Sequence, residues 1–175
     1  MLNPGYLCEC VGVAPGMRVA DFGSGSHGWF SHRLMQEVGS EGRVYAVDVR
    51  PEALAVLARA HNGTGTTGAL ETIWSDIEHF GGTSIPHASL DRIFIINVVS
   101  ELQDVVAAFR ESERLLAPQG KIFVVDWARG IHPLAPSALV PPDRVVMAAQ
   151  ETGMLSAEHV FSAGEHHYGI IIGRV

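Results

Sequence analysis

The sequence has little cysteine, few basic residues and no long apolar run. Its only two cysteines, Cys8 and Cys10, are separated by one residue, which excludes a disulfide framework and favours a reducing compartment. Lys and Arg number 12 against 19 Asp and Glu, so the net charge is −7, which argues against a nucleic-acid partner. No segment approaches the roughly 20 apolar residues of a membrane span, and no basic-then-apolar leader opens the chain. We therefore expect a cytoplasmic protein without membrane insertion.

What the chain does have is enough apolar material for a core of its own. It is 175 residues long, with 47% apolar and 18% charged residues and a mean hydropathy of +0.18. We expect residues 1–175 to form a single domain. The histidine pairs His27/His32 and His166/His167 lack the helical spacing of two ligands on one face, and the Cys-x-Cys has no second pair. No metal site is expected.

The stretch 19–30 (VADFGSGSHGWF) is the one around which the chain is organised. An apolar run stops at Gly23-Ser24-Gly25, and apolar residues then resume at helical spacing with Phe30 and Leu34. The pattern predicts a strand, a tight turn and a helix. Glycines let the backbone approach a ligand closely, and the free N–H groups of a helix's first turn favour a negative group. We expect a ligand with a carboxylate or a phosphate here.

Strands and helices alternate along the rest of the chain. Apolar runs bounded by Gly, Pro and Asp predict strands, and i/i+3/i+4 spacing predicts helices. We expect strands at 18–22, 43–49, 71–75, 91–99, 121–127, 158–162 and 167–175, and helices at 29–38, 51–60, after a capping box at Ser100, and at 142–152. Loops are expected at 61–69, 81–89 and 128–141, and a short helix or arm at 1–16.

This order predicts an α/β fold with a doubly wound, mostly parallel seven-stranded sheet and a C-terminal antiparallel hairpin. In such folds ligands bind across the carboxyl ends of the strands. Polar residues stand at four of the predicted strand ends: Asp21, Asp48, Asp76 and Asn97. They are candidate site residues, although carboxylates and Asn also serve as strand terminators and helix caps.

Two interpretations of the glycine loop remain open at this point. Gly23-x-Gly25-x-x-Gly28, with Asp48 twenty residues later, has the spacing of a dinucleotide-binding fingerprint and predicts an NAD(P)-binding protein. Asp21, however, would repel a bound pyrophosphate and attract an ammonium group. The 48 residues after position 127 also leave little room for a hydride-acceptor domain.

From 16–25 (GMRVADFGSG) to the final hairpin, the chain resembles class I S-adenosylmethionine-dependent methyltransferases. The segments 118–127 (PQGKIFVVDW) and 141–145 (PPDRV) resemble the branch with the ubiquinone and menaquinone C-methyltransferases and the arsenite methyltransferases. The resemblance implies S-adenosylmethionine as cofactor and a Rossmann-like fold. It covers nearly the whole length, and its motifs indicate the superfamily better than the substrate.

The resemblance also implies roles for nine residues. Asp21 would hold the methionine part of the cofactor with three residues of the loop, Gly23, Ser24 and Gly25. Asp48 would accept hydrogen bonds from both ribose hydroxyls. The adenine would pack on Val49, with its amino group on Asp76 beside the Ile77 backbone, and Asn97 would lie near the transferred methyl. An acceptor-only carboxylate suits a diol or an amine.

The loop departs from the family pattern Asp-x-Gly-x-Gly-x-Gly at its third glycine. Here His27 stands at that position and Gly28 follows. Either His27 replaces the glycine or it is a one-residue insertion, and the continuation Gly28-Trp29 matches the family better as an insertion. The loop is then wider than usual, which bears on the affinity and pose of the cofactor.

We expect an enzyme that methylates a small, largely apolar molecule, since Trp29 and Trp127 could wall an apolar pocket with the loop at 128–141. A second subunit could complete that pocket as a homodimer. The cofactor carries most of the chemistry of methyl transfer. His27, His132, Glu101 and Asp126 are candidate bases, and none is assigned as catalytic. The alternatives are a non-catalytic S-adenosylmethionine-binding partner or regulatory protein and the NAD(P)-binding protein.

Overall fold

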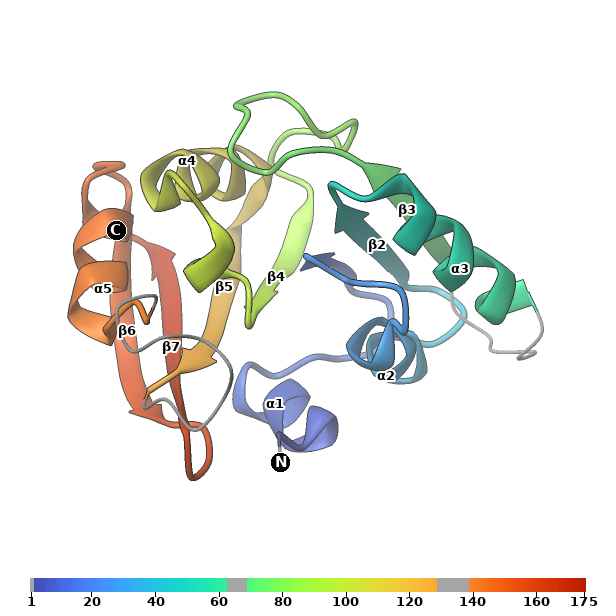
Figure 1. Cartoon of the computed structure of the whole chain (residues 1–175), viewed down its shortest axis with the longest axis horizontal. Helices are drawn as coiled ribbons and strands as arrows, with labels where there is room; N and C mark the ends of the chain where they lie inside the picture. Colours follow the sequence, from blue (N-terminus) through green and yellow to red (C-terminus); the bar gives the residue numbers. More distant parts are fainter. Residues whose placement is uncertain (1, 63–68, 129–138) are drawn as a thin grey trace.

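The computed structural model describes residues 2–62, 69–128 and 139–175 (Figure 1). Seven strands form one sheet in the order β3-β2-β1-β4-β5-β7-β6. The first five strands run parallel, and β7 is antiparallel to both of its neighbours. The strands are β1 (Arg18–Phe22), β2 (Arg43–Asp48), β3 (Ala69–Trp74), β4 (Leu90–Ile96), β5 (Leu116–Trp127), β6 (Leu155–Ser162) and β7 (His167–Arg174). The predicted fold class is confirmed.

Helices pack against this sheet in two apolar clusters. One cluster joins the sheet to α4 and α5, through Phe109 and Val145 among others, and the second joins it to α1 and α2, through Leu7 and Phe30. Figure 1 shows α3 beside β3, at the opposite end of the sheet from α5. The helices are α1 (Pro4–Cys10), α2 (Trp29–Val38), α3 (Pro51–Asn62), the 3₁₀ turn η1 (Val99–Glu101), α4 (Val105–Leu115) and α5 (Pro142–Gln150).

The unit β1–loop–α2 forms with the predicted bounds. The last four residues of β1 are buried, as in a parallel strand covered on both faces. On α2 the residues Phe30, Leu34 and Val38 are buried on one side. The helix ends at Gly39, whose φ of +65° needs a glycine and whose N–H donates to the Met35 carbonyl at 3.1 Å.

The predicted capping box at Ser100 is wrong. Strand β4 ends at Ile96, not at 99, and the 3₁₀ turn η1 intervenes before α4 begins at Val105. The cap is Asp104, whose side chain accepts a hydrogen bond from the Ala107 N–H at 2.9 Å. Asp104, four positions after Ser100, is also a favoured N-cap residue, so the sequence offered the helix a second starting point.

Strand β5 also begins earlier than predicted. Residues 116–120, which precede the predicted start at 121, belong to the strand, and the pairing with β4 shifts register between Leu90 and Arg92. At Gly120 a Cβ atom would lie 2.7 Å from the Leu90 carbonyl oxygen, so the two backbones pass too closely for a side chain. Most of the loops predicted at 61–69 and 128–141 lies outside the described residues.

Candidate functional site

Parallel pairing brings the polar strand ends to one edge of the sheet, where they surround a pocket of about 280 Å³. Six of the nine predicted site residues line it: Gly23, Asp48, Val49, Asp76, Ile77 and Asn97. The other three, Asp21, Ser24 and Gly25, are not among its lining residues. The segments that form the pocket are thus the ends of β1, β2, β3 and β4 and the turn η1.

Asp48, at the end of β2, has every acceptor position filled. Its Oδ2 accepts the Gly25 N–H at 2.8 Å and the Arg50 Nη2 at 3.2 Å. Its Oδ1 accepts the backbone N–H and the Nε of Arg50, both at 3.0 Å. A carboxylate offers about four lone-pair sites. Two backbone donors and the two-pronged guanidinium therefore share this carboxylate.

The charge state of Asp48 follows from these contacts. The carboxylate side chain is 3% exposed, and burial by itself raises its pKa, but the Arg50 guanidinium and the N–H groups of Arg50 and Gly25 outweigh burial and lower the pKa overall. Asp48 is thus ionised at neutral pH. The Arg50 side chain, at 59% exposed, is free to leave the carboxylate for solvent at little desolvation cost.

Asp21, at the end of β1, lies beneath the glycine loop. Its Oδ2 accepts the Ser31 hydroxyl at 2.5 Å, and the Ser31 N–H also bonds to the carboxylate. Gly28, the N-cap of α2, has no side chain to cap the helix, so Asp21 does this from the strand. Burial raises the pKa of Asp21 to about 7, although the Ser31 bonds oppose that rise.

We expect Asp21 to make stability fall as pH rises. The pKa of Asp21 is higher in the folded state than its usual 3.8, so its contribution is complete below about pH 4 and is lost as pH approaches 7. Relative to Asp21→Asn, the native chain should lose about 1.4 kcal/mol per pH unit in this window and nothing further above it. Urea unfolding of both proteins between pH 4.5 and 8 measures this. Parallel pH profiles of the two proteins would contradict it.

The glycines of the loop are required by geometry at two positions. A Cβ on Gly23 (φ +75°) would lie 2.3 Å from Val98 Cγ2, and one on Gly28 (φ +51°) would lie 2.1 Å from Leu57 Cδ1. His27 is exposed and is absent from the non-glycine residues with positive φ. Gly28 is therefore the glycine that the helix start requires, which favours the insertion interpretation of His27.

A second pocket, of about 490 Å³, adjoins the first. Its lining includes Leu2, Pro4, Trp29 and Trp127, and its surface is almost wholly apolar. Asn97 lines both pockets. Its backbone has φ +56°, a conformation that Asn tolerates better than most residues, and its N–H donates to the Val125 carbonyl at 2.8 Å. The predicted apolar pocket with both tryptophans is therefore present.

The buried polar atoms without a hydrogen-bond partner gather at this same edge. In the described part of the chain they are Ser24 Oγ, Asn97 Oδ1, Ser100 Oγ, Asp126 Oδ2 and His167 Nε2. All follow the ends of parallel strands or lie beside them, since His167 pairs with Trp127. Buried polar groups are nearly always paired with protein, water or a ligand. This edge therefore has unfilled hydrogen-bonding capacity, as a binding site has.

The candidate bases occupy different places. Glu101 lines the first pocket. Asp126 is buried and accepts the Trp127 N–H on Oδ1 at 2.7 Å. Burial raises its pKa, although the backbone N–H groups of Trp127, Ser100 and Val99 oppose that rise. His27 is exposed on the loop, 3.2 Å from Ser26 Oγ. His132 lies outside the described residues. No catalytic residue follows from this geometry.

Arg50, Val98 and Leu102 line the first pocket and were not predicted as site residues from the sequence. Glu101, which lines it too, was one of the candidate bases. The position of Arg50 between Asp48 and Pro51, which begins α3, could have signalled a residue at the strand end. Nothing in the sequence signals that its side chain turns back to the carboxylate.

The described residues offer neither a metal cluster nor a membrane-spanning helix. No cluster of three or more His, Cys, Asp or Glu that could hold a metal was found in residues 2–62, 69–128 and 139–175. Within the same ranges, no helix has the length and apolar character needed to cross a bilayer. Both cysteines are unpaired thiols, and burial raises the pKa of Cys8 to about 12.

The strand order and the polar edge around a glycine loop define a class I methyltransferase fold. The chain belongs to the methyltransferase domain family, whose model matches residues 20–124. The class that the resemblance implied is thereby confirmed, and the family favours it over an NAD(P)-binding protein.

Similar proteins agree with this family. The chain is 28% identical over 129 residues to the ubiquinone/menaquinone biosynthesis C-methyltransferase UbiE of Shewanella sp. (strain ANA-3). The aligned segment covers 74% of this chain and 50% of that protein. The chain thus spans about half the length of the curated relatives it matches. A SAM dependent methyltransferase from Aquifex aeolicus has the same fold, with a TM-score of 0.88 and 23% identity over 99% of this chain and 90% of that one. The arsenic (III) S-adenosylmethionine methyltransferase of Chlamydomonas reinhardtii has a TM-score of 0.67 and 23% identity over 91% and 64% of the two chains.

Proposed function

We propose that this protein is an S-adenosylmethionine-dependent methyltransferase that acts on a small, largely apolar molecule. The observation that carries the proposal is that Asn97 lines both pockets. A pocket of mixed polar and apolar surface, suited to a nucleoside, and an apolar pocket suited to an acceptor therefore meet at one residue. A group carried at the end of the first ligand would face the second there.

The residues of the first pocket fit the cofactor. Asp48 would accept the two ribose hydroxyls, Val49 would pack on the adenine, and Asp76 beside the Ile77 backbone would take the adenine amino group. Asp76 Oδ1 accepts the Glu78 N–H at 2.8 Å, which leaves Oδ2 for such a donor. Gly23 lines the pocket and has no side chain, which lets a ligand approach its backbone closely.

The methionine part of the cofactor would lie along Ser24, Gly25 and Asp21. Ser24 Oγ has no partner among the described residues, so it is available as a donor or an acceptor. Burial raises the pKa of Asp21 to about 7. An ammonium group beside the carboxyl group would favour its ionised form. The loop thus offers a carboxylate to the cation and N–H groups to the ligand carboxylate.

In the transfer itself the cofactor supplies the electrophilic methyl group. The chain aligns the two ligands and excludes water, because Trp29 and Trp127 wall the acceptor pocket with apolar surface. Asn97 Oδ1, which has no partner among the described residues, would accept a hydrogen bond at the junction.

Titration calorimetry with S-adenosylmethionine, S-adenosylhomocysteine and NAD, each added to the purified chain, tests the cofactor. Micromolar binding of the first two without a response to NAD supports the proposal. A screen of apolar acceptors with radiolabelled cofactor then tests catalysis. Binding without turnover on any acceptor would favour the non-catalytic partner, and binding of NAD alone would favour the dinucleotide interpretation.

Arg50→Ala is expected to tighten S-adenosylhomocysteine binding about fivefold. The guanidinium holds Asp48 through two N–H groups, and a ribose diol brings two O–H donors for the same lone pairs, so ligand and Arg50 compete. One displaced, partly exposed ion pair is worth about 1 kcal/mol. Calorimetry in low and high salt checks this, since salt should tighten binding to the native chain and not to the variant. Weaker binding by Arg50→Ala would mean that Arg50 is itself a ligand-binding residue.

We also propose that residues 1–175 act as one cytoplasmic domain with no nucleic-acid partner. Both apolar clusters pack on the same seven-stranded sheet, and the net charge of −7 disfavours a polyanion. A homodimer stays a prediction. Sedimentation equilibrium across a range of concentrations tests it, and a constant monomer mass would reject it.

A further inference from the structure

The loop that follows β3 and carries Asp76, at residues 75–83, folds back on itself. The His79 N–H donates to the Asp76 carbonyl at 3.2 Å, and the Gly82 N–H donates to the His79 carbonyl at 2.8 Å. At Gly82 a Cβ atom would be only 3.1 Å from the Asp76 carbonyl oxygen and from Ser75 Oγ. The far end of the loop therefore lies directly against the backbone of Asp76.

Glu111, in the middle of α4, holds that far end. Its carboxylate is completely buried and accepts the Gly81 N–H at 2.7 Å, the Thr83 hydroxyl at 2.6 Å and the Thr83 N–H at 3.3 Å. Arg114 completes the cluster with Nε at 2.8 Å and Nη2 at 2.6 Å. Gly81 and Thr83 flank Gly82, so Glu111 fixes the residue that abuts Asp76.

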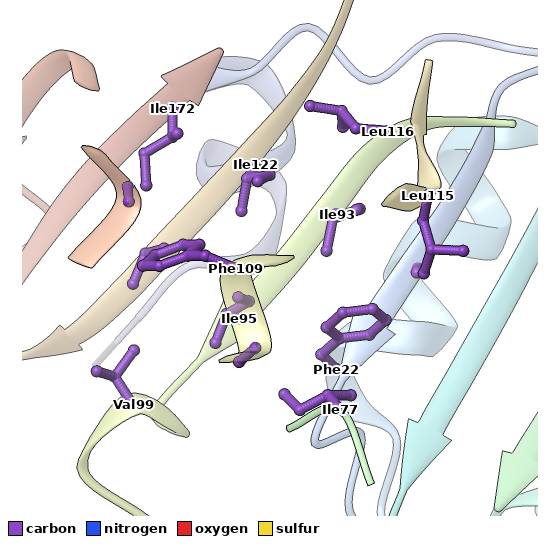
Figure 2. Packing of buried hydrophobic residues seen from close by; sticks show 14 of the residues in the cluster. Phe22, Ile77, Ile93, Ile95, Val99, Phe109, Leu115, Leu116, Ile122 and Ile172 are labelled. Carbon is purple, nitrogen blue, oxygen red and sulfur yellow. The ribbon is translucent and has the colours of Figure 1, made fainter. Parts of the chain in front are cut away.

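The same loop is attached at two further points. The Glu78 carboxylate accepts the backbone N–H of Asp104, the N-cap of α4. Ile77 is buried in the apolar cluster that contains Phe22 of β1, and Figure 2 shows both side chains at one end of the cluster. Helix α4 thus anchors the Asp76 wall of the first pocket at its beginning and in its middle.

Asp76 itself is exposed, so packing of its own side chain does not determine where the carboxylate points. The Glu78 N–H orients one oxygen, and the loop backbone determines the position of the rest. A hydrogen bond tolerates little displacement before it weakens. Recognition of a donor by Asp76 therefore depends on how firmly the loop backbone is held.

We infer that Glu111 is a positioning residue for purine recognition, because it holds the loop that presents Asp76 to the amino group of the adenine. The inference rests on the proposed function, which gives Asp76 this partner. It extends the site by a residue that touches no ligand and lies one loop away from the pocket. It predicts that loss of Glu111 weakens the preference of the site for a purine with an amino group over one with a carbonyl oxygen, in addition to any loss of folding stability.

The test compares S-adenosylhomocysteine with S-inosylhomocysteine, in which a carbonyl oxygen replaces the amino group. For the native chain we expect calorimetry to give a preference for the adenosyl compound of at least tenfold. In Glu111→Gln that preference should fall at least fivefold, because the adenosyl compound loses affinity and the inosyl compound does not. Glu113→Gln, on the same helix but paired with Arg174, is the matched control and should keep the native preference.

Thr83→Val gives the test a second variant that perturbs folding less, since it removes one hydroxyl from the cluster and keeps the shape. It should lower the preference two- to threefold. Equal weakening of both compounds, or an unchanged preference in folded Glu111→Gln and Thr83→Val, overturns the inference alone. Failure of the native chain to bind S-adenosylhomocysteine overturns the proposed function, and the inference with it.

Discussion

Asp48→Asn is expected to weaken S-adenosylhomocysteine binding about a hundredfold, because two hydrogen bonds from the ribose lose their charged acceptor. A bond to a charged group is worth about 1.5–3 kcal/mol and a neutral bond about 1 kcal/mol. Asparagine has the same shape, so Gly25 can still donate to the side-chain oxygen. The amide NH2, however, replaces the oxygen that accepts the backbone N–H and Nε of Arg50, so the thermal midpoint of the free protein should fall too. The affinity is therefore compared at a temperature where both proteins are folded.

Glu52→Gln is a suitable control, since it removes an exposed carboxylate in the first turn of α3. Its charge acts on Arg50 as that of Asp48 does, though more weakly. We expect less than a twofold change in affinity from this variant. Calorimetry on both variants at one ionic strength gives the comparison. An unchanged affinity in folded Asp48→Asn would remove Asp48 from the ribose site.

Combining Asp48→Asn with Arg50→Ala separates competition from direct binding. If Arg50 acts only by occupying the Asp48 carboxylate, its removal gains nothing once that carboxylate is an amide. The double variant should then bind as weakly as Asp48→Asn alone. If the effects of the two substitutions simply add, the two residues act independently. That result would contradict competition for the Asp48 oxygens, which Arg50 Nε and Nη2 contact at 3.0 and 3.2 Å.

The polar edge could be predicted because parallel topology fixes where strand ends lie. Once β1, β2, β3 and β4 are parallel, the residues that follow them must meet at one edge, whatever their side chains do. Asp48, Asp76 and Asn97 came together for this reason. The bounds of β1 and α2 were predictable as well, because Gly39 stops the helix where the apolar spacing ends.

The orientation of side chains within that edge was not predictable. Strand β1 is buried on both faces, so no alternation of polar and apolar residues tells which face receives Asp21. The structure puts it against Ser31 of α2. Arg50 likewise makes contacts that depend on the path of the chain after Pro51, and a guanidinium two residues from a carboxylate is usually solvated.

Glu111 illustrates a different limit. In the sequence it is one charged residue on a helix that also carries Arg110 and Glu113, and such residues are mostly exposed. Apart from Arg114, its donors come from Gly81 and Thr83, 30 and 28 positions earlier in the chain. Helical periodicity gives the face of a residue but not the loop that covers it. Only the tertiary fold reveals this buried charge.

Glu111→Ala is expected to lower the free energy of unfolding by about 3–5 kcal/mol, which is typical when one partner of a buried ion pair is removed. The donors on Gly81 and Thr83 would lose their acceptor, and the Arg114 guanidinium, 15% exposed, would lose its counter-charge. Urea unfolding at pH 7 measures this. Glu113→Ala, at a pair with 4.0 Å between its charged atoms, should cost less than about 1 kcal/mol.

The pH dependence of that difference follows from the pKa of Glu111. Burial alone would raise it, but the bonds from Arg114, Thr83 and Gly81 bring it down to about 2, from a usual value of 4.5. A depressed folded-state pKa stabilises the fold above the unfolded value, and this contribution is lost as pH falls from about 4.5 toward 2. The gap between the native chain and Glu111→Ala should therefore be constant from pH 5 to 7 and shrink by pH 3.

Adding Arg114→Met to Glu111→Leu separates the ion pair from the loop donors. Replacing a whole buried pair with apolar side chains is often neutral, so a cluster whose role is only charge pairing should regain native stability. The Gly81 and Thr83 N–H groups would still lack an acceptor in this double variant, and each unsatisfied donor costs about 1–3 kcal/mol. We therefore expect the double variant to recover less than half of the unfolding free energy that Glu111→Ala loses. Full recovery would mean that the loop does not depend on the Glu111 carboxylate, and would count against its role in positioning Asp76.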